Sequence, residues 1–392
     1  MNKLILHTGV QHFILENQDT DIMSVLLKNQ QFEGISQKEL AEQLESRKKC
    51  QEKLPTWFQS KGIYYPNKLN IEQTSSEVTA LYKSSLVYGK TLLDLTGGLG
   101  VDSYFFSKKI EQVTHCEINQ DLSEIARHDF KILGQENIEC VSEDGVTFLQ
   151  KTGQHFDWIY VDPSRRNDKT GKVFLLKDCF PDLTLHLDII LQKTSNVLIK
   201  TSPLLDIKQG ISELKFVKEV HVLATQNEVK ELLFVIEKGY EGDIRIKTAN
   251  ILQGQKDEFH FNLLEEENAP LELGEPSTYL YEPNAAILKS GGFKIIGNVF
   301  QLQKLHPHSH LYTSAKLMDF PGRRFKINDT FPYSKKTLKS FNASKANITT
   351  RNFPIAVAEL RKKHKISDGG NHYLFFTKNM EGDLMVLACE KA

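Results

Sequence analysis

The sequence lacks the features that would place the protein in or across a membrane. No apolar run approaches the roughly 20 residues that a membrane-spanning helix requires. The first residues, MNKLILHTGVQHFILENQD, have neither the long apolar core nor the small-residue cleavage site of a signal peptide. We therefore expect a soluble, cytoplasmic protein with no membrane partner.

Cysteine is scarce and irregularly spaced. The chain has five cysteines, an odd number, and none of them forms a CxxC pair. This pattern argues against both a disulfide framework and a zinc cluster, so we expect buried thiols that pack as small apolar side chains. The cysteines are Cys50, Cys116, Cys140, Cys179 and Cys389.

Net charge is almost absent, but the charges are unevenly distributed. The formal net charge is -1, yet residues 301–392 hold 16 Lys and Arg against 7 Asp and Glu, a balance of +9. The preceding 300 residues carry a balance of -10. A basic C-terminal part indicates an anionic partner there, unless these charges only form an ordinary solvated surface.

The length and patterning predict several domains and no repeats. With 392 residues, 40% of them hydrophobic, the chain is long enough for two or three domains. We predict an N-terminal helical region over residues 1–71 and an α/β domain over 72–253. A linker followed by a small ferredoxin-like α+β segment is expected over 254–315, and a basic module over 316–392. The stretch from about 254 to 275 is acidic and broken by Pro and Gly, which marks it as the linker.

Strand-like and helix-like segments alternate between residues 90 and 200. TLLDL, VTHCEI, NIECV, DWIYVD and NVLIKT are apolar runs separated by amphipathic stretches, a rhythm that predicts βαβ units in a parallel sheet. VKEVHVLAT and KELLFVIEK follow, separated only by QNEV. They predict an antiparallel pair that closes one edge of the sheet. The predicted fold class is therefore α/β.

The segment LLDLTGGLGVD (92–102) forms the first turn between strand and helix. In a parallel sheet this turn is the usual place for a nucleotide, and Gly98 and Gly100 allow close backbone approach. The third glycine of GxGxxG is missing, so the dinucleotide signal is weak. Asp94 would repel a pyrophosphate but attract the ammonium group of a methionine moiety. The electrostatics favour S-adenosylmethionine over a nicotinamide dinucleotide.

Two further acids follow successive strand ends. Glu117 lies about 20 residues on, where a carboxylate can accept hydrogen bonds from both ribose hydroxyls. Asp144 follows the third strand, where it can accept from the adenine amino group. A single such acid is often only a helix N-cap, and Asp144 before GVTFLQ fits that alternative. Three acids in register are harder to explain as caps.

The motifs LLDLTGGLG, CEIN, SEDG and VDPSRR resemble those of class I S-adenosylmethionine-dependent methyltransferases, over roughly residues 72–240. The resemblance implies a Rossmann-like, seven-stranded sheet whose last strand is antiparallel, with S-adenosyl-L-methionine as cofactor. It implies that Asp94, Gly98 and Gly100 line the methionine end, Glu117 the ribose and Asp144 the adenine. The cofactor-binding residues that we predict are Gln73, Ser75, Asp94, Thr96, Gly98, Gly100, Asp102, Glu117, Ile118, Asp144, Gly145 and Asp162.

Two details of this resemblance leave alternatives open. Thr96 stands where the family usually has its first glycine. Upstream, IEQTSSEVTALYKSSL (71–86) reads as a loop that enters a helix, with Ser75 or Ser76 as the cap. In similar enzymes this segment touches the methionine carboxylate, so Gln73 and Ser75 are predicted either to do so or to serve only as caps.

VDPSRR lies at the predicted end of the fourth strand and resembles the DPPY-type motif of amino-methyltransferases. There an acidic or amide side chain and a proline carbonyl hold an exocyclic nitrogen in line with the methyl group. We predict Asp162, Pro163, Ser164 and Arg165 as the catalytic residues. Ser164 and Arg165 replace a proline and the aromatic residue that stacks on a base, so N- and O-methylation both remain open.

The residues around this motif bear on the chemistry. Arg165 and Arg166, with Lys169 and Lys172, would grip phosphates or pair with nearby acids. The end of the fifth strand, IKTSPLLD, has Ser202 and no cysteine. We therefore expect no covalent activation of a pyrimidine.

The C-terminal segment KANITTRNFPIAVAELRKKHKISDGGNHYLFFT is similar to the THUMP-like domains attached to some bacterial methyltransferases. THUMP domains proper bind RNA. Arg361, Lys362 and Lys363 beside Phe353, Tyr373 and Phe375 would suit phosphate neutralisation with limited stacking, unless the aromatic residues belong to the core.

The alternating histidines of LHPHSHLY, residues 306, 308 and 310, have the spacing of metal ligands on one strand face. No Cys, Asp or Glu lies within the cluster to complete a site. We therefore expect no metal.

These expectations combine into one leading hypothesis. It is an S-adenosylmethionine-dependent methyltransferase that acts on RNA, either tRNA or rRNA, without a cysteine nucleophile. The alternatives are a methyltransferase for a protein or a small molecule, and a non-catalytic RNA-binding protein that retains the cofactor.

Overall fold

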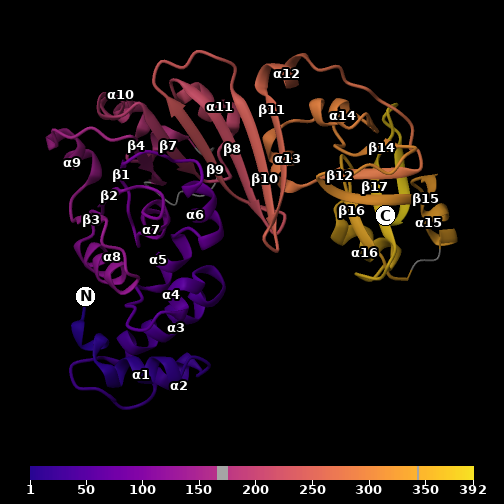
Figure 1. Cartoon of the computed structure of the whole chain (residues 1–392). Helices are drawn as coiled ribbons and strands as arrows, with labels where there is room; N and C mark the ends of the chain where they lie inside the picture. The colour runs from indigo at the N-terminus through magenta and orange to yellow at the C-terminus, as the bar shows by residue number, and fades with distance from the viewer. Residues whose placement is uncertain (166–174, 342–343) are drawn as a thin grey trace. The chain divides into compact units, whose positions relative to one another are not determined.

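The computed structural model describes residues 1–165, 175–341 and 344–392, and these fall into two units (Figure 1). Unit 1 comprises residues 1–217 and 233–241, and unit 2 comprises residues 218–232 and 242–392. No helix among the described residues is both long and apolar enough to span a membrane.

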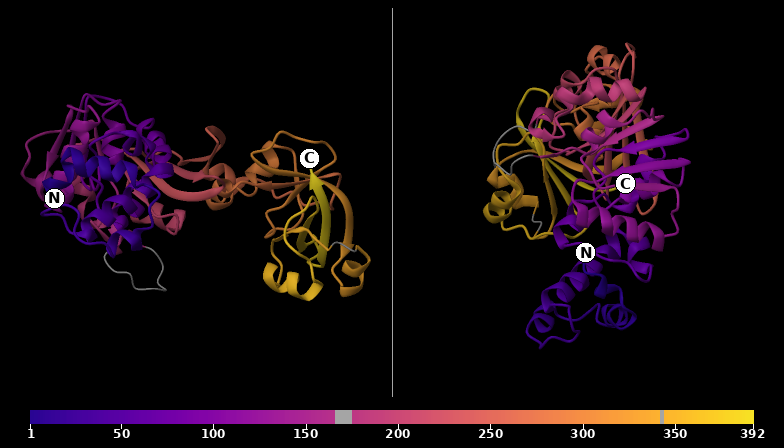
Figure 2. Two further views of the ribbon diagram at one scale, coloured as in Figure 1. Left: turned by 90° about the horizontal axis from the view of Figure 1, so that it is seen from below. Right: turned by 90° about the vertical axis from the view of Figure 1, so that its left-hand side faces the viewer.

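The N-terminal part of unit 1 is helical, as predicted. Its longest helix, α3, begins at a capping box in which Ser36 and Glu39 satisfy each other's backbone N–H groups. Leu40 and Leu44 of α3 pack with Trp57 in the core of this region. The right view of Figure 2 shows these helices as an indigo group below the sheet of unit 1. The elements are η1 (Lys3–Leu6), α1 (Thr8–Glu16), α2 (Ile22–Leu26), α3 (Gln37–Lys53), α4 (Pro55–Gln59) and α5 (Lys68–Gln73).

Five parallel strands form the centre of unit 1. β1 (Thr91–Asp94) lies between β2 (Gln112–Cys116) and β4 (Trp158–Val161), followed outward by β3 (Ile138–Val141) and β7 (Asn196–Thr201). The carboxyl ends of these strands therefore meet at one edge, as the sequence predicts.

Helices cover both faces of this sheet, with α6, α7 and α8 on one side and α9, α10 and α11 on the other (Figure 1). The amphipathic pattern of the connecting segments explains this arrangement. The helices are α6 (Glu77–Ser84), α7 (Val101–Phe106), α8 (Gln120–Ile132), α9 (Gly145–Lys151), α10 (Leu183–Lys193) and α11 (Ile207–Glu213).

The strand order is β11-β10-β8-β9-β7-β4-β1-β2-β3. β8 (Val217–Thr225) and β9 (Glu228–Glu237) are joined by a two-residue turn in which Gln226 and Asn227 both have positive φ, as in a type I′ hairpin. The order from β8 to β3 contains the seven predicted strands and confirms the α/β fold class.

The expectation that this pair closes the sheet is wrong. β10 (Arg245–Leu252) pairs in parallel with β8, and β11 (Gln255–Asn262) pairs antiparallel with β10. Phe259 and Phe261 of β11 are buried, whereas residues 255–258 are exposed.

The stretch predicted as a linker therefore contains an edge strand, followed by α12 (Leu263–Asn268). Its acidic character misled the interpretation, because charged residues are common on edge strands, where they discourage pairing with another chain.

A second sheet, in unit 2, forms the predicted α+β module. Its strand order is β13-β14-β12-β15-β18-β17-β16. Phe325 and Phe375 pack on one face, and Phe376 packs with Leu360 of α16 on the other. The strands are β12 (Tyr279–Pro283), β13 (Gln303–Lys304), β14 (Tyr312–Ser314), β15 (Gly322–Pro332), β16 (Asn347–Thr350), β17 (Tyr373–Lys378) and β18 (Leu384–Lys391). The helices are α13 (Ala285–Ser290), α14 (Ile295–Val299), α15 (Lys335–Phe341) and α16 (Val357–His364).

The aromatic residues of this module belong mainly to its core. Phe375 is 1% exposed, Tyr373 packs against the same cluster, and Phe353 packs against Phe376 with ring centroids 5.4 Å apart. The alternative in which these rings are core residues is therefore correct for Phe375. Phe375 therefore offers no surface on which a base could stack, whereas Tyr373 and Phe353 remain partly exposed.

Candidate cofactor and catalytic site

A cavity of about 280 Å³ opens at the carboxyl ends of β1, β2 and β4. Its wall consists largely of residues that the sequence singled out. Gly100 and Pro163 are not part of this wall. The predicted residues that line it are Gln73, Ser75, Asp94, Thr96, Gly98, Asp102, Glu117, Ile118, Asp144, Gly145, Asp162 and Ser164.

Asp94, at the end of β1, is almost completely buried. Its carboxylate accepts hydrogen bonds from Ser103 Oγ at 2.6 Å and from the Thr96 backbone N–H at 3.0 Å. Burial raises the pKa of Asp94 to about 7 despite these bonds. A cationic ligand nearby would favour its ionised form, so this carboxylate is suited to a positively charged group.

The glycines of the turn serve different purposes. Gly98 has a φ of +57° and donates its N–H to Glu117 Oε2 at 2.9 Å. Gly100 has a φ of +83°, and a Cβ there would lie 2.2 Å from the Phe130 ring. Gly100 therefore allows packing at the start of α7, whereas Gly98 faces the cavity.

The side chain of Thr96 stabilises this turn by a hydrogen bond. Its Oγ1 accepts a hydrogen bond from the backbone N–H of Asp162 at 2.7 Å. The side chain thus connects the end of β1 to the end of β4. A glycine at position 96 could not make this contact.

Glu117, at the end of β2, binds two backbone N–H groups. Besides Gly98, it accepts from the N–H of Asn119 at 2.7 Å. The next residue, Ile118, exposes 62% of its surface along the wall of the cavity. An apolar side chain there would suit the face of a planar ring.

Asp144 is the N-cap of α9, as the alternative interpretation proposed. Its Oδ2 accepts from the N–H and from the Oγ1 of Thr147, both at 2.8 Å. Gly145 follows it, and a Cβ there would lie 2.2 Å from the carbonyl oxygen of Leu95. Both residues line the cavity, so Asp144 caps α9 and forms part of the cavity wall at the same time.

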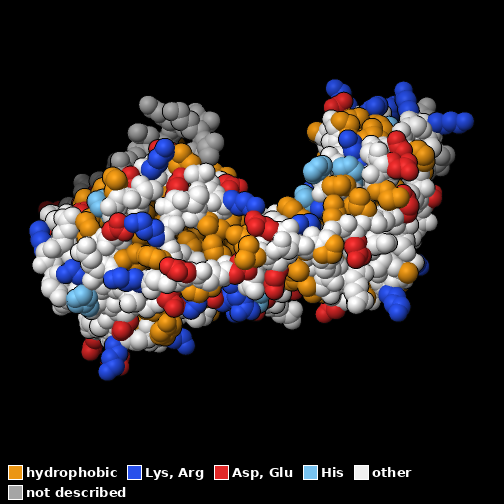
Figure 3. Space-filling view, turned by 90° about the horizontal axis from the view of Figure 1, so that it is seen from above, with side chains coloured by type: hydrophobic (Ala, Val, Ile, Leu, Met, Phe, Trp, Pro, Cys, Tyr) orange, Lys and Arg blue, Asp and Glu red, His pale blue; other side chains and the backbone are white. Residues whose placement is uncertain are grey.

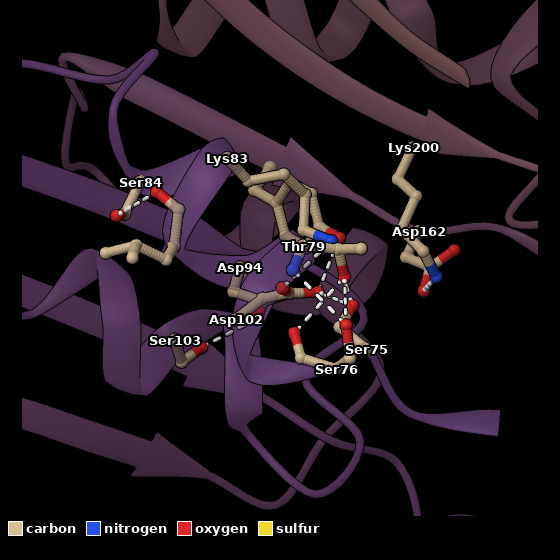
Figure 4. Close-up of polar contacts among 12 residues, drawn as sticks. Ser75, Ser76, Thr79, Lys83, Ser84, Asp94, Asp102, Ser103, Asp162 and Lys200 are labelled. Atoms are coloured by element: carbon tan, nitrogen blue, oxygen red, sulfur yellow. Dashed lines mark hydrogen bonds and ion pairs between the residues drawn. The ribbon is translucent and has the colours of Figure 1, made fainter. Parts of the chain in front are cut away.

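The sequence did not predict a buried ion pair, in which Lys83 binds Asp102 of the cavity wall (Figure 4). Lys83 of α6 is 0% exposed, and its Nζ lies 3.1 Å from Asp102 Oδ1 and 2.9 Å from Ser75 Oγ. Ser75 and Tyr160 each donate a hydroxyl hydrogen bond to Asp102 Oδ2 at 2.8 Å. Burial opposes ionisation of Asp102, but Lys83 and Lys200 hold its pKa below the usual value. Ser76, rather than Ser75, is the N-cap of α6.

Asp162 also has a partner that the sequence did not predict. Lys200 Nζ, from β7, lies 2.5 Å from Asp162 Oδ2 (Figure 4). The register of β4 and β7 explains this contact, since Val161 lies opposite Ile199 and the next residues are therefore neighbours. The sequence shows only that Asp162 and Lys200 each lie near the end of a predicted strand.

An aromatic ring reaches the cavity from a segment that gave no signal in the sequence. Phe180 of β6 (Cys179–Phe180) is 45% exposed and lines the wall. β6 pairs with β5 (Ser164–Arg165), and Phe180 lies opposite Ser164. A ring is therefore present next to the position where the DPPY-type motif would have one. The Arg165 side chain and residues Arg166, Lys169 and Lys172 lie outside what the structure describes.

In unit 2, two arginines converge on one buried carboxylate. Glu282, whose side chain is 3% exposed, binds Arg351 at 2.7 Å and Arg323 Nε at 2.6 Å. The side chains of Arg323 and Arg351 remain 45% and 35% exposed. Glu282 therefore fixes two guanidinium groups at the surface.

The predicted basic helix contributes less than expected to an anion site. Arg361 pairs with Asp368 and donates to the carbonyl oxygen of Ala346 at 3.1 Å, so its guanidinium group stabilises the C-terminal module itself. Lys362 is exposed. On the face shown in Figure 3, Lys and Arg side chains are spread over the surface rather than gathered in one patch.

The three histidines are engaged in different contacts. His306 Nδ1 lies 3.0 Å from Asn352 Nδ2, and His310 stacks on Phe293 with ring centroids 3.7 Å apart. Within the described part of the chain, no group of three His, Cys, Asp or Glu residues is placed to hold a metal ion.

Two family models match the C-terminal part of the chain. A ferredoxin-like domain matches residues 279–321, and a THUMP domain-like model matches residues 322–391. A curated protein of Mycoplasma mobile, named an uncharacterized RNA methyltransferase, is 27% identical over 198 residues, which cover 47% of this chain. The match spans about half, 54%, of that relative.

A solved structure matches the whole chain. It is described as a "putative methyltransferase from Porphyromonas gingivalis W83", shares 33% sequence identity and has a TM-score of 0.91. The match covers 100% of this chain and 99% of the other. The chain therefore belongs to the family of this Porphyromonas gingivalis protein, which joins a class I S-adenosylmethionine-dependent methyltransferase fold to C-terminal ferredoxin-like and THUMP-like domains.

Proposed function

We propose that the protein transfers a methyl group from S-adenosylmethionine to RNA, with tRNA and rRNA as the substrates to test first. One observation carries the proposal: the cavity that places Asp94, Glu117 and Asp144 in one wall also contains Asp162. A single cavity thus offers groups for a methyl donor and a group for an acceptor.

The chemistry of the wall fits the cofactor. Glu117 and Asp144 are acceptors for hydroxyl and amino groups, and the exposed side chain of Ile118 offers an apolar face. Asp94, with a pKa raised to about 7 by burial, would be stabilised in its ionised form by the methionine ammonium. When bound, the cofactor supplies a methyl group activated by a sulfonium centre. The protein's own contribution is to position the acceptor and to exclude water.

Three features support RNA as the substrate. The C-terminal residues match a THUMP domain-like model, and the Mycoplasma mobile relative is named an RNA methyltransferase. Phe180 exposes a ring at the cavity, on which a base could stack. Arg323 and Arg351 present fixed guanidinium groups, which suit phosphate contacts.

The proposal can be tested with the full chain. Purified protein, methyl-labelled S-adenosylmethionine and total RNA from a strain that lacks the gene are incubated together, and the RNA is isolated. We expect label in the RNA fraction and its loss in the Asp162→Ala variant. Asp188→Ala, which changes a carboxylate whose side chain is 69% exposed, is the matched control. Label only in protein or in small molecules would contradict the proposal.

Calorimetry separates catalysis from cofactor retention. We expect Asp162→Ala to bind S-adenosylmethionine with nearly the affinity of the unmodified protein while its turnover is lost. If the unmodified protein binds the cofactor and RNA but transfers no methyl group, a non-catalytic RNA-binding protein becomes the better description.

A further inference from the structure

We infer that the methyl acceptor is a hydroxyl oxygen, and that on RNA it is the 2′-hydroxyl of a ribose. The inference deepens the function proposed above and rests on it. It comes from the pair formed by Asp162 and Lys200, which neither the DPPY-type resemblance nor the sequence pattern included.

Asp162, directly after β4, and Lys200, in β7, are contributed by neighbouring strands. Lys200 Nζ lies 2.5 Å from Asp162 Oδ2, and the two side chains are 15% and 32% exposed. The Asp162 backbone N–H is fixed by Thr96 Oγ1 at 2.7 Å. Asp162 lines the cavity, and Figure 4 shows Lys200 beside it and apart from the Lys83 cluster. An ammonium group from the neighbouring strand therefore lies directly beside a carboxylate of the cavity wall.

This arrangement is complementary to a hydroxyl group. A hydroxyl has one hydrogen to donate and two lone pairs to share. It can donate to Asp162, accept from Lys200 with one lone pair, and keep the second lone pair for attack on the methyl carbon. An exocyclic amino nitrogen has only one lone pair, and an ammonium group beside it would compete for that pair. Lys200 therefore favours an oxygen acceptor over a nitrogen acceptor.

The proton balance of the step is also satisfied. As the C–O bond forms, the C–S bond of the sulfonium breaks and its electron pair stays on sulfur. The methylated oxygen then carries its proton as an oxonium, which is far more acidic than a carboxylic acid. A carboxylate is therefore a sufficient base, and the proton passes to Asp162 and then to solvent. Lys200 orients the hydroxyl by donating to its oxygen, while the neighbouring Asp162 carboxylate offsets the positive charge of the oxonium until the proton is transferred.

Phe180 indicates which hydroxyl group fits. The ring lies opposite Ser164 in the β5–β6 pair and is 45% exposed at the cavity. Asp162 lines the same cavity, so a base stacked on this ring would have its ribose in the cavity that holds the carboxylate. The 2′-hydroxyl is the group of RNA that every internal nucleotide carries and DNA lacks.

Nucleoside analysis of the unmodified protein's product tests the inference without any variant. The labelled RNA is digested to nucleosides, and mass spectrometry assigns the label to the ribose or to the base fragment. Label on the ribose is the expected result. Label on the base would overturn the hydroxyl inference while the proposed function stands, and absence of label from all RNA would instead contradict the proposed function.

Variants of Lys200 test the role of the pair. Lys200→Met should lower the methylation rate by about 100-fold or more, with little change in the dissociation constant for S-adenosylmethionine. Lys200→Arg, which retains a donor, should recover part of the rate. Lys215→Met, an exposed lysine paired with Asp188, is the control. Ribose methylation at the unmodified rate in a folded, cofactor-binding Lys200→Met protein would refute the role of Lys200.

Discussion

Breaking the buried pair of Lys83 and Asp102 should strongly destabilise unit 1. Their side chains are 0% and 11% exposed, and the charged atoms are 3.1 Å apart. At an effective dielectric constant of about 20, unit charges at this separation attract by roughly 5 kcal/mol. Removing one partner leaves the other charge buried, which costs about 3–5 kcal/mol. We expect Lys83→Met to lower the free energy of unfolding of unit 1 by about this amount.

A double variant distinguishes an unpaired charge from lost packing. Asp102→Asn alone should also be strongly destabilised, because Lys83 would then lack its carboxylate. In Lys83→Met/Asp102→Asn neither charge remains, so the combined loss should be smaller than the sum of the single losses by about 2 kcal/mol. Losses that simply add would mean that the two side chains act independently.

Tryptophan fluorescence gives the right assay for this experiment. The chain has 2 tryptophans, Trp57 and Trp158, and both lie in unit 1, where they are 1% and 2% exposed. Urea unfolding followed by their emission therefore reports on unit 1 and not on unit 2. Lys215→Met breaks an exposed pair and should cost less than about 1 kcal/mol. A loss of that small size for Lys83→Met would refute the reasoning.

Three further predictions concern the turn after β1 in unit 1 and the surface of unit 2. Burial raises the pKa of Asp94 from 3.8 to about 7, so the folded protein binds the Asp94 proton more tightly than the unfolded chain does. Asp94 therefore makes the free energy of unfolding fall as the pH rises from about 4 to about 7. Asp94→Asn should therefore flatten the pH dependence of the urea midpoint, and an unchanged pH profile would count against a buried, protonated Asp94. Gly100→Ala should destabilise unit 1 more than Gly98→Ala, since its Cβ would lie 2.2 Å from an aromatic ring, whereas at Gly98 only the left-handed backbone costs about 1–2 kcal/mol. Equal urea midpoints would contradict this. If Arg323 contacts a phosphate, Arg323→Met should lower the dependence of RNA affinity on log salt by about 0.7–0.9, whereas the exposed Lys28→Met should not, as titrations at several salt concentrations would reveal.

The sequence predicted the sheet and the position of the site better than the identity of the reacting groups. Parallel strands bring their carboxyl ends to one edge, so acids placed after successive strands had to meet. Gly98, Glu117 and Asp162 could be located in this way. Lys83 could not, because α6 is short and a single lysine does not reveal which side of a helix is buried.

Lys200 and Phe180 were missed for different reasons. The strands β4 and β7 were both predicted, and their register would have placed Lys200 beside Asp162, but the pattern alone does not say which strands are neighbours. Phe180 belongs to a two-residue strand, which is too short for any periodicity. The acidic strand β11 was taken for a linker because its alternating Phe259 and Phe261 are outnumbered by polar neighbours.

The sequence left open whether the strand-end acids are helix caps or cofactor ligands. In the structure the two roles are compatible. Each of these carboxylates accepts a backbone N–H: Asp94 from Thr96, Glu117 from Gly98, and Asp144 from Thr147. A carboxylate has about four acceptor sites, so one or two such bonds leave others for a ligand. The bonds also fix the carboxylates before any ligand arrives, which lowers the entropy lost on binding. The same acids can therefore shape the turn and bind the cofactor.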